Sequence, residues 1–221
     1  MNSFTDRFVH ILIISLVTVL VDILSIAQGA FEDCKSLLAI NIPSSVTAIE
    51  EDAFKNCTYL RNISISSSSN LGEDVEFEST FSNFAKVGCT FDMLRGRFDG
   101  FPVHRLCFYN LHQNVEHNNA YEQLKEMVRL PTSNSNAVDC LGMTPLHVLA
   151  CSGTHELRLF RCLIENHPDA LITKDKWGDT PLVYVLLSGS SMEIIHYFFE
   201  VHRSKWGTIS IDFGESTQRM G

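Results

Sequence analysis

The strongest constraint on the fold of this chain is an internal repeat in its N-terminal third. Residues 26–43 read IAQGAFEDCKSLLAINIP, and residues 49–66 read IEEDAFKNCTYLRNISIS. At a constant offset of 23 residues, the first copy's Ile26, Ala30, Phe31, Cys34, Leu37, Ile40 and Ile42 recur as Ile49, Ala53, Phe54, Cys57, Leu60, Ile63 and Ile65. The final Leu-x-x-Ile-x-Ile alternates like a short strand. A unit this short cannot bury its Phe and Leu side chains alone, so we expect the units to stack on one another.

The pattern resembles the BspA-type leucine-rich repeat, which reads roughly L-x-x-I-x-I-P-x-S-V-x-x-I-x-x-x-A-F-x-x-C. Residues 40–57 follow it closely, with Phe54 in the place that Phe31 holds one unit earlier. The resemblance implies a segment of leucine-rich repeats over residues 20–66. After Ser66 the sequence becomes serine-rich and then acidic, and we therefore expect residues 67–98 to form a solvated joint.

A second repeat, with a different period, occupies the C-terminal half of the chain. Residues 139–150 read DCLGMTPLHVLA, and 36 residues later residues 175–186 read DKWGDTPLVYVL. The shared D-x-x-G-x-T-P-L resembles the signature of the ankyrin repeat, in which a finger-like turn leads into a pair of helices. Both segments are therefore expected to begin a helix pair.

The residue types in this motif predict where the first helix of each pair begins. Thr144 and Thr180 are expected to cap backbone N–H groups that have no partner at a helix start. Pro145 and Pro181 suit the first helical position, where no N–H donor is needed.

A third, degenerate copy of this motif lies upstream. Residues 100–107 parallel residues 143–150 at an offset of 43 residues, although Phe101 replaces the capping threonine. The apolar spacing predicts second helices over 121–130, 156–166 and 192–201. We therefore expect three ankyrin-like units over residues 99–206, followed by a tail at residues 207–221.

The N-terminal segment has an ambiguous apolar run. Residues 8–21 read FVHILIISLVTVLV, and the run resumes after Asp22. A helix needs about 20 apolar residues to cross a bilayer, and this run is shorter. Three interpretations stay open: residues 1–19 pack on the repeats as a cap, residues 8–27 anchor the chain in a membrane, or the segment is a cleaved signal.

The 23-residue spacing bears on the interpretation in which the segment packs on the repeats. Stepping back 23 residues from Ile40 and Ile42 reaches Val17 and Val19, which are also apolar. The segment could in this way supply a further layer of the leucine-rich stack, which needs several units for stability.

Composition and charge restrict the classes of function. Hydrophobic residues make up 45% and charged residues 19%, which is typical of a globular chain. With 26 acidic and 17 basic side chains, the formal net charge of −9 argues against a nucleic-acid-binding protein. The seven cysteines include no C-x-x-C pair and are too sparse for a disulfide scaffold, which favours a cytoplasmic location.

The sequence offers no motif for catalysis or for cofactor binding. It contains no G-x-S-x-G, Walker loop or G-x-G-x-x-G, and its cysteine and histidine spacings suit no zinc site. We therefore expect no catalytic residue, no metal ligand and no cofactor. His104 and His147 are interpreted as structural, with rings that hydrogen-bond within and between repeats, because Val183 takes the same position in the next unit.

These patterns together predict an α+β repeat protein. A short leucine-rich β-solenoid segment is followed by an α-helical ankyrin-type solenoid, and the predicted function is non-enzymatic binding of a protein partner. The alternative is a membrane-anchored or secreted recognition protein that uses the same repeats.

The two middle residues of each D-x-x-G finger are predicted to point away from the helices and to be the most exposed apolar groups. Leu141, Lys176 and Trp177 are therefore the candidate partner-binding residues, with Trp177 supplying a large rigid surface. The competing interpretation is that Trp177 lies against the neighbouring finger and completes the stack.

Overall fold

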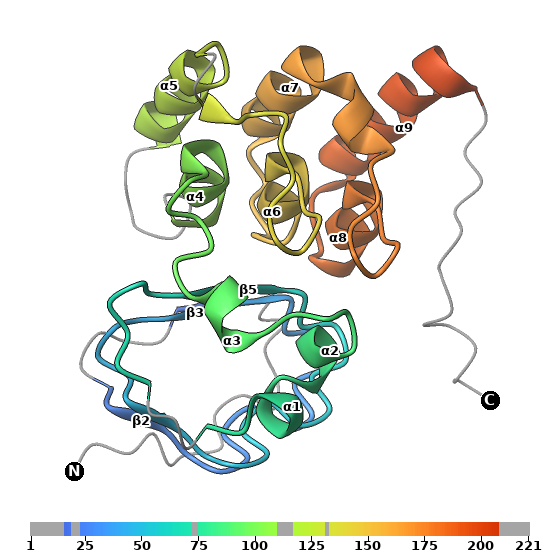
Figure 1. Cartoon of the computed structure of the whole chain (residues 1–221). Coiled ribbons are helices and arrows are strands. Elements are labelled where there is room, and N and C mark those ends of the chain that lie inside the picture. The colour runs from blue at the N-terminus through green and yellow to red at the C-terminus, as the bar shows by residue number, and fades with distance from the viewer. Residues whose placement is uncertain (1–15, 19–22, 72–74, 110–116, 131–132, 208–221) are drawn as a thin grey trace, which may run out of the picture. The chain divides into compact units, whose positions relative to one another are not determined.

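A computed structural model describes residues 16–18, 23–71, 75–109, 117–130 and 133–207 of the 221-residue chain. The chain divides into two compact units, residues 1–100 and residues 101–221 (Figure 1). Each unit has its own set of elements and is described by itself below.

The strands of the first unit are short, and every pair of them is parallel. They are β1 (Leu16–Thr18), β2 (Ser25–Ile26), β3 (Ala39–Ile42), β4 (Ala48–Ile49) and β5 (Asn62–Ile65). They form a three-stranded sheet in the order β1-β3-β5 and a two-stranded sheet in the order β2-β4. Ile40 pairs with Ile63, and Ile26 pairs with Ile49. Strands that pair in a sheet are therefore separated by the 23-residue period.

The N-terminal apolar run contributes one strand to this sheet. In β1, Val17 pairs with Ile40, which is the register that the 23-residue step predicts. This pairing supports the interpretation in which the segment packs on the repeats, although Val19 and residues 1–15 lie outside the described residues. Among the helices in the described part of the chain, none has both the length and the apolar character needed to cross a membrane.

A ladder of phenylalanine rings fills the first unit beside its strands. The rings of Phe31 and Phe54 are stacked with centroids 5.3 Å apart, and those of Phe54 and Phe81 are stacked at 5.4 Å. All three side chains are buried. The repeated Ala-Phe motif therefore supplies the core that a single 23-residue unit cannot make alone.

Residues 67–98 differ from the predicted solvated joint. Where they are described, they fold as α1 (Phe77–Thr80), α2 (Ser82–Ala85) and α3 (Phe91–Leu94). Phe81 extends the ring ladder, and the N–H of Gly96 donates to the carbonyl of Ile65 at 2.9 Å. The segment thus packs on the second repeat. The spacing from Phe54 to Phe81 is 27 residues, so a search at an offset of 23 does not find this copy.

The second unit consists of paired helices. They are α4 (Pro102–Tyr109), α5 (His117–Met127), α6 (Pro145–Ala150), α7 (Leu157–Asn166), the 3-10 helix η2 (Pro168–Leu171), α8 (Pro181–Leu187) and α9 (Met192–Trp206). Within this unit, α4, α6 and α8 form one row, and α5, α7 and α9 form a second row (Figure 1). The three predicted helix pairs are confirmed.

The boundaries of the second helices differ from the prediction. Helix α5 spans His117–Met127 rather than 121–130, α7 begins one residue later than predicted, and α9 continues to Trp206, five residues beyond the predicted end. The added residues of α9 include neither glycine nor proline, so nothing in them stops a helix until Gly207, whose φ of 85° ends it. Of the predicted tail, residues 208–221 lie outside the described residues.

Candidate functional site

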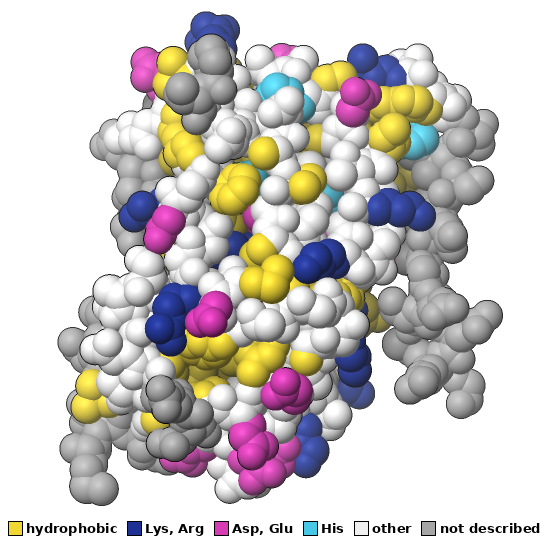
Figure 2. All heavy atoms as spheres, viewed as in Figure 1, with side chains coloured by type: hydrophobic (Ala, Val, Ile, Leu, Met, Phe, Trp, Pro, Cys, Tyr) yellow, Lys and Arg dark blue, Asp and Glu magenta, His cyan; other side chains and the backbone are white. Residues whose placement is uncertain are grey.

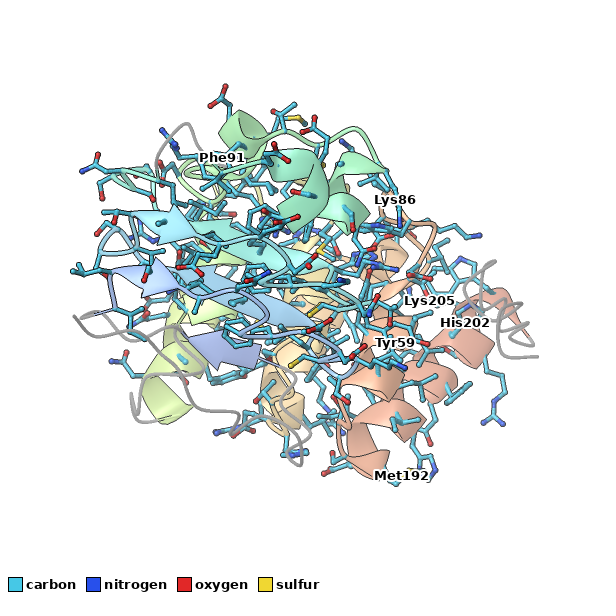
Figure 3. The ribbon with its side chains drawn as sticks, turned by 90° about the horizontal axis from the view of Figure 1, so that it is seen from below. Tyr59, Lys86, Phe91, Met192, His202 and Lys205 are labelled. Atoms are coloured by element: carbon cyan, nitrogen blue, oxygen red, sulfur yellow. The ribbon has the colours of Figure 1, made fainter. Side chains whose placement is uncertain are left out.

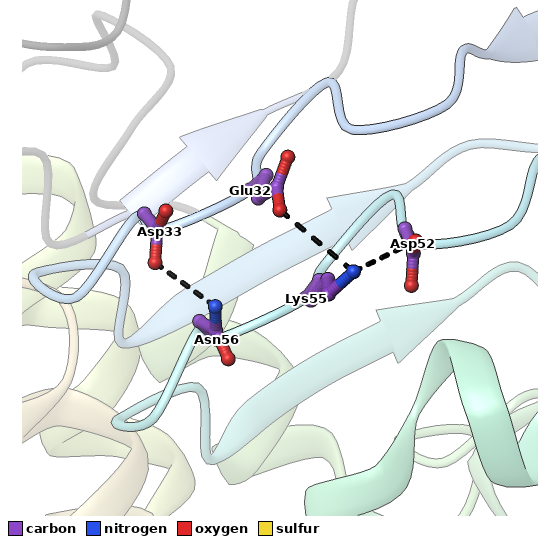
Figure 4. A network of polar contacts seen from close by, with 5 residues as sticks. All are labelled: Glu32, Asp33, Asp52, Lys55 and Asn56. Atoms are coloured by element: carbon purple, nitrogen blue, oxygen red, sulfur yellow. Dashed lines mark hydrogen bonds and ion pairs between the residues drawn. The ribbon is translucent and has the colours of Figure 1, made fainter.

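The exposed turns of the leucine-rich repeats carry a polar ladder at the repeat spacing (Figure 4). Asn56 Nδ2 donates to Asp33 Oδ1 at 3.0 Å, and Lys55 Nζ lies 4.0 Å from Glu32 Oε1 and 3.0 Å from Asp52 Oδ2. Asp33, Asp52 and Asn56 all have φ near 59°, a left-handed conformation that Asp and Asn tolerate better than most residues. Because exposed ion pairs stabilise little, this ladder is a feature of the turn rather than a site.

Two cysteines of the repeat also lie in register in the first unit. The buried Cys57 thiol donates to the carbonyl of Phe31 at 2.9 Å. The neighbouring thiols affect each other: the contact with Cys57 lowers the pKa of Cys34, while the contact with Cys34, followed by burial, raises the pKa of Cys57. All seven cysteines lie in the described residues and none of them forms a disulfide; Cys34 and Cys140 are half-buried, and the other five are buried.

The ankyrin fingers are shaped by a buried aspartate at their first position. Asp139 Oδ1 accepts hydrogen bonds from the backbone N–H groups two and four residues later, at 2.8 and 3.0 Å. Asp175 Oδ1 makes the same two contacts at 2.9 and 3.0 Å. Gly142 and Gly178 follow with φ of 74° and 85°, which glycine adopts without strain. The D-x-x-G pattern therefore sets the geometry of the finger.

The two motif histidines join successive units. His104 Nε2 lies 2.9 Å from the carbonyl oxygen of Met143, and His147 Nε2 lies 3.2 Å from that of Asp179. Both rings are fully buried. Burial lowers the pKa of His147 to about 4, so its ring is neutral at pH 7. Both rings therefore make the hydrogen bonds between units that the structural interpretation predicts.

The capping prediction holds for one threonine and is wrong for the other. Thr144 forms a capping box with His147: the Thr144 hydroxyl accepts from the His147 N–H, and the ring Nδ1 accepts from the Thr144 N–H at 3.1 Å. Thr180 precedes Pro181 but makes no side-chain cap. The N–H of Val183 instead donates to the backbone carbonyl of Thr180 at 3.0 Å, and Val183, which stands in place of His147, has no ring nitrogen to form a capping box. Pro145 and Pro181 both begin their helices as predicted.

One buried pair in the last unit was missed by sequence reasoning. The Tyr184 hydroxyl donates to Asp175 Oδ2 at 2.5 Å. The N–H groups of the finger bind the other carboxylate oxygen, Oδ1. Burial raises the pKa of Asp175 to about 6. The available signal was a tyrosine in the otherwise apolar helix PLVYVLL, since a buried phenol needs a hydrogen-bonding partner.

The candidate partner-binding residues divide into three environments. Leu141 is 0% exposed, so the prediction that it presents an exposed contact is wrong. The next finger covers it, because the N–H of Lys176 donates to the Leu141 carbonyl at 3.0 Å. Lys176 has an exposed side chain, and Trp177 is half-buried.

The expectation that finger residues are the most exposed apolar groups is also wrong. Among the described residues, the large apolar side chains with the highest exposure are Met192 at 62%, Leu24 at 58% and Leu130 at 54%. None of them belongs to a D-x-x-G finger. On the face shown in Figure 2, acidic and basic side chains are interspersed rather than gathered into one basic field.

Three residues with perturbed pKa values lie side by side in the ankyrin unit: the Tyr184 ring meets the His147 ring edge-on with centroids 6.0 Å apart, and the Tyr184 hydroxyl donates to Asp175. His147 and Asp175 each bind backbone groups of the fingers, and Tyr184 serves Asp175. In the described ranges, no group of three or more His, Cys, Asp or Glu side chains is placed to hold a metal ion.

Comparison with known families agrees with this geometry. The model of the BspA type leucine rich repeat region (6 copies) matches residues 7–91, and that of ankyrin repeats (3 copies) matches residues 111–205. The chain therefore carries BspA-type leucine-rich repeats followed by ankyrin repeats, in the predicted order. The first match extends beyond the predicted segment at both ends, and the second begins after α4. No curated protein and no solved structure matches the chain.

Proposed function

We propose that this protein is a non-enzymatic interaction protein whose two units are solenoids, each presenting an extended repeat surface to a protein partner. Both repeat families are typically non-catalytic binding modules. The observation that carries the proposal is that the same hydrogen bonds, from two backbone N–H groups to the carboxylate of the first aspartate, recur in successive fingers. Side chains at equivalent positions are thereby held at the repeat spacing, which suits recognition of an extended protein surface.

Within the ankyrin unit, Lys176 is the proposed centre of partner binding. Its backbone is held from both sides, because its N–H donates to Leu141 and the N–H of Gly178 donates to Asp175 at 3.0 Å. An exposed side chain on such a rigid turn loses little conformational freedom of the backbone on binding. Trp177 flanks this position, whereas the buried Leu141 is excluded from the proposal.

The test compares partner capture by three forms of the full-length chain. Lys176→Glu reverses the charge at the finger, and Lys205→Glu makes the same change at an exposed position on α9. We expect a partner cross-linked by the wild type to be lost with Lys176→Glu and retained with Lys205→Glu. Equal capture by all three forms would remove the finger from the proposal.

Trp177→Ala separates a contact role from a packing role. If Trp177 contacts the partner, the substitution weakens capture and leaves the melting temperature of the ankyrin unit unchanged. If Trp177 packs on its neighbours, the substitution lowers that melting temperature.

A membrane-anchored or secreted protein with the same repeats is the second candidate, and it rests on the apolar run at residues 8–27. We favour a cytoplasmic protein because Val17 pairs with Ile40 in the repeat sheet. A strand used in this way is not also part of a spanning helix. Sedimentation of the full-length protein with membranes after a high-salt wash would favour the anchored alternative instead.

A further inference from the structure

Cys34 and Cys57 occupy the same position in the two leucine-rich repeats, 23 residues apart. The turns that hold them are hydrogen-bonded to each other. The N–H of Asp33 donates to the carbonyl of Lys55 at 2.9 Å, and Asn56 Nδ2 donates to Asp33 Oδ1 at 3.0 Å (Figure 4). Figure 3 shows the strands of the first unit side by side, in the order β1-β3-β5. The two cysteines therefore lie on neighbouring turns of adjacent repeats.

The Cys57 thiol reaches across to the turn that holds Cys34. Its Sγ atom lies 2.9 Å from the carbonyl oxygen of Phe31, and the backbone N–H of Cys34 donates to the same oxygen at 3.2 Å. A single carbonyl therefore joins the Cys57 sulfur to the Cys34 backbone. Hydrogen-bonded neighbouring strands lie about 4.7–4.9 Å apart, and a disulfide joins Cα atoms about 4.4–6.8 Å apart. The arrangement of the two turns thus suits a disulfide between them.

The two thiols differ in their access to solvent. Cys34 is half-buried, whereas Cys57 is 2% exposed. Helix α2 lies against the Cys57 turn, since Asn83 Nδ2 donates to the Cys57 carbonyl at 2.8 Å. A small molecule that diffuses to this pair therefore meets the Cys34 thiol first, and the Cys57 thiol is protected behind it.

The surroundings of Cys34 favour attack on an uncharged oxidant. The contact with the Cys57 thiol lowers the pKa of the Cys34 thiol, which raises the fraction of thiolate, the form that acts as a nucleophile. Residues 32–35 and 50–55 carry five carboxylates and two lysines, so the charge beside the pair is negative. Negative charge repels anionic oxidants and leaves the approach of neutral ones unaffected.

We propose that Cys34 and Cys57 form a reversible oxidation site for small uncharged hydroperoxides, of which hydrogen peroxide is the simplest. The Cys34 thiolate attacks one peroxide oxygen, the O–O bond breaks, and the other oxygen leaves as hydroxide and takes up a proton to become water. The Cys57 sulfur then attacks the Cys34 sulfenic acid. The S–S bond forms, the S–O bond breaks, and the departing hydroxide leaves as water with the Cys57 thiol proton. The two sulfurs lose two electrons, and one peroxide is reduced to two water molecules.

The disulfide joins the two turns covalently without leaving a buried acceptor unpaired. The carbonyl of Phe31 loses the Cys57 S–H but keeps the N–H of Cys34 as a donor. Asp33 and Asn56 directly precede the two cysteines, so the cross-link also fixes the polar ladder of the exposed turns. Oxidation should therefore make these turns more rigid and leave the ankyrin unit unchanged. The inference goes beyond the proposed function and does not depend on any partner.

The experiment treats the full-length, reduced chain with hydrogen peroxide, and a parallel sample with oxidised glutathione, an anionic oxidant. Remaining thiols are then blocked with iodoacetamide under denaturing conditions. The predicted product of trypsin digestion is peptide 8–35 joined to peptide 56–61, which mass spectrometry identifies before and after reduction with dithiothreitol. Cys140→Ser is the matched control, because Cys140 is the other half-buried cysteine.

We expect the linked peptides in the wild type and in Cys140→Ser, and their loss in Cys34→Ser and Cys57→Ser. Glutathione should form the link about tenfold more slowly than peroxide does. In Cys57→Ser the sulfenic acid has no thiol to react with, so dimedone, which traps sulfenic acids, should label Cys34 about tenfold faster than Cys140. Oxidation of the wild type should slow amide exchange in residues 53–57 by about tenfold, and dithiothreitol should reverse this change. Circular dichroism checks folding, and Cys57→Ala replaces the serine variant if that variant fails to fold.

Three results would overturn the proposal. In the first, the wild type yields no linked peptides at any peroxide concentration that leaves its circular dichroism spectrum intact. In the second, oxidation joins Cys34 to a different cysteine or to another molecule, which non-reducing electrophoresis shows as a dimer. In the third, oxidised glutathione forms the link as fast as hydrogen peroxide does, which would contradict a site for uncharged hydroperoxides.

Discussion

At the residue scale, the last ankyrin unit shows how one substitution between repeats changes several contacts. His147 closes the capping box of Thr144 and reaches the next finger through Asp179. Val183 occupies the equivalent position and can do neither. The two helix starts share their Thr-Pro sequence, but a side-chain cap stabilises only the first of them.

Alanine substitution of the two threonines should therefore have unequal effects. Thr144→Ala removes a buried cap and should lower the free energy of unfolding of the ankyrin unit by about 1 kcal/mol. Thr180→Ala removes no side-chain cap and should change it by a few tenths at most, since only ~0.5 kcal/mol is usual away from such contacts. Urea denaturation of both variants measures the difference, and equal losses would contradict the assigned box.

Two buried groups of this unit should give opposite pH dependences. The pKa of His147 is lowered to about 4, so the unfolded chain binds its proton first and stability falls as the pH drops from 6.5 to 4. The pKa of Asp175 is raised to about 6, so the folded chain binds its proton first and stability rises as the pH drops from 6 to 4. In the wild type the two contributions nearly cancel.

Single variants should reveal each contribution. Between pH 6 and pH 4, His147→Gln should gain roughly 2 kcal/mol of stability relative to the wild type, and Asp175→Asn should lose a similar amount. Denaturant unfolding of the three proteins across this range measures how the free energy of unfolding changes with pH. A loss of stability that is the same at every pH does not affect this slope. Parallel slopes for all three proteins would show that neither group titrates as assigned.

At the scale of elements, the ring ladder of the first unit makes its coils depend on their neighbours. Phe54 stacks on both Phe31 and Phe81, whereas Phe31 stacks on Phe54 alone among the described rings. Each ring contact between aromatic side chains adds about 0.5–1.5 kcal/mol beyond buried area. The middle coil should therefore be the most sensitive to loss of its ring.

Leucine substitutions test this dependence while keeping the positions apolar. Phe54→Leu removes two ring contacts and should cost about 1 kcal/mol more than Phe31→Leu, which removes one. Thermal or chemical unfolding of the first unit measures both. An equal cost for the two variants would mean that the stacking adds nothing beyond burial.

At the scale of the whole molecule, the two units are expected to unfold separately, because repeats couple mainly to their neighbours. Phe54→Ala should cost the first unit about 3–5 kcal/mol as a core truncation and leave the ankyrin transition in place. Calorimetry should show two transitions, of which this substitution moves only one. A single transition that shifts as a whole would contradict independent units.

Much of this organisation could be predicted from the sequence, because repeated structure needs repeated residues. The 23-residue match anticipated the strand register, including the pairing of Val17 with Ile40. The Gly and Pro residues of the second repeat marked its turns and helix starts, since their backbone preferences are local. Residues 67–98 escaped the same reasoning because their copy of the coil changes its spacing to 27 residues and replaces part of it with short helices.

The sequence by itself therefore determined the two repeat families, their order, and the residues that shape each turn, all of which depend on local backbone chemistry and period. Only the tertiary structure decided which equivalent residues are covered. Leu141 is buried and Trp177 half-buried at the same point of the same motif, because a following finger is present in one case. The Asp175–Tyr184 pair likewise joins a turn to a helix nine residues later. Whether a residue is buried, and which side chain it contacts, depends on what packs alongside its repeat. The residues of one repeat do not specify that neighbour.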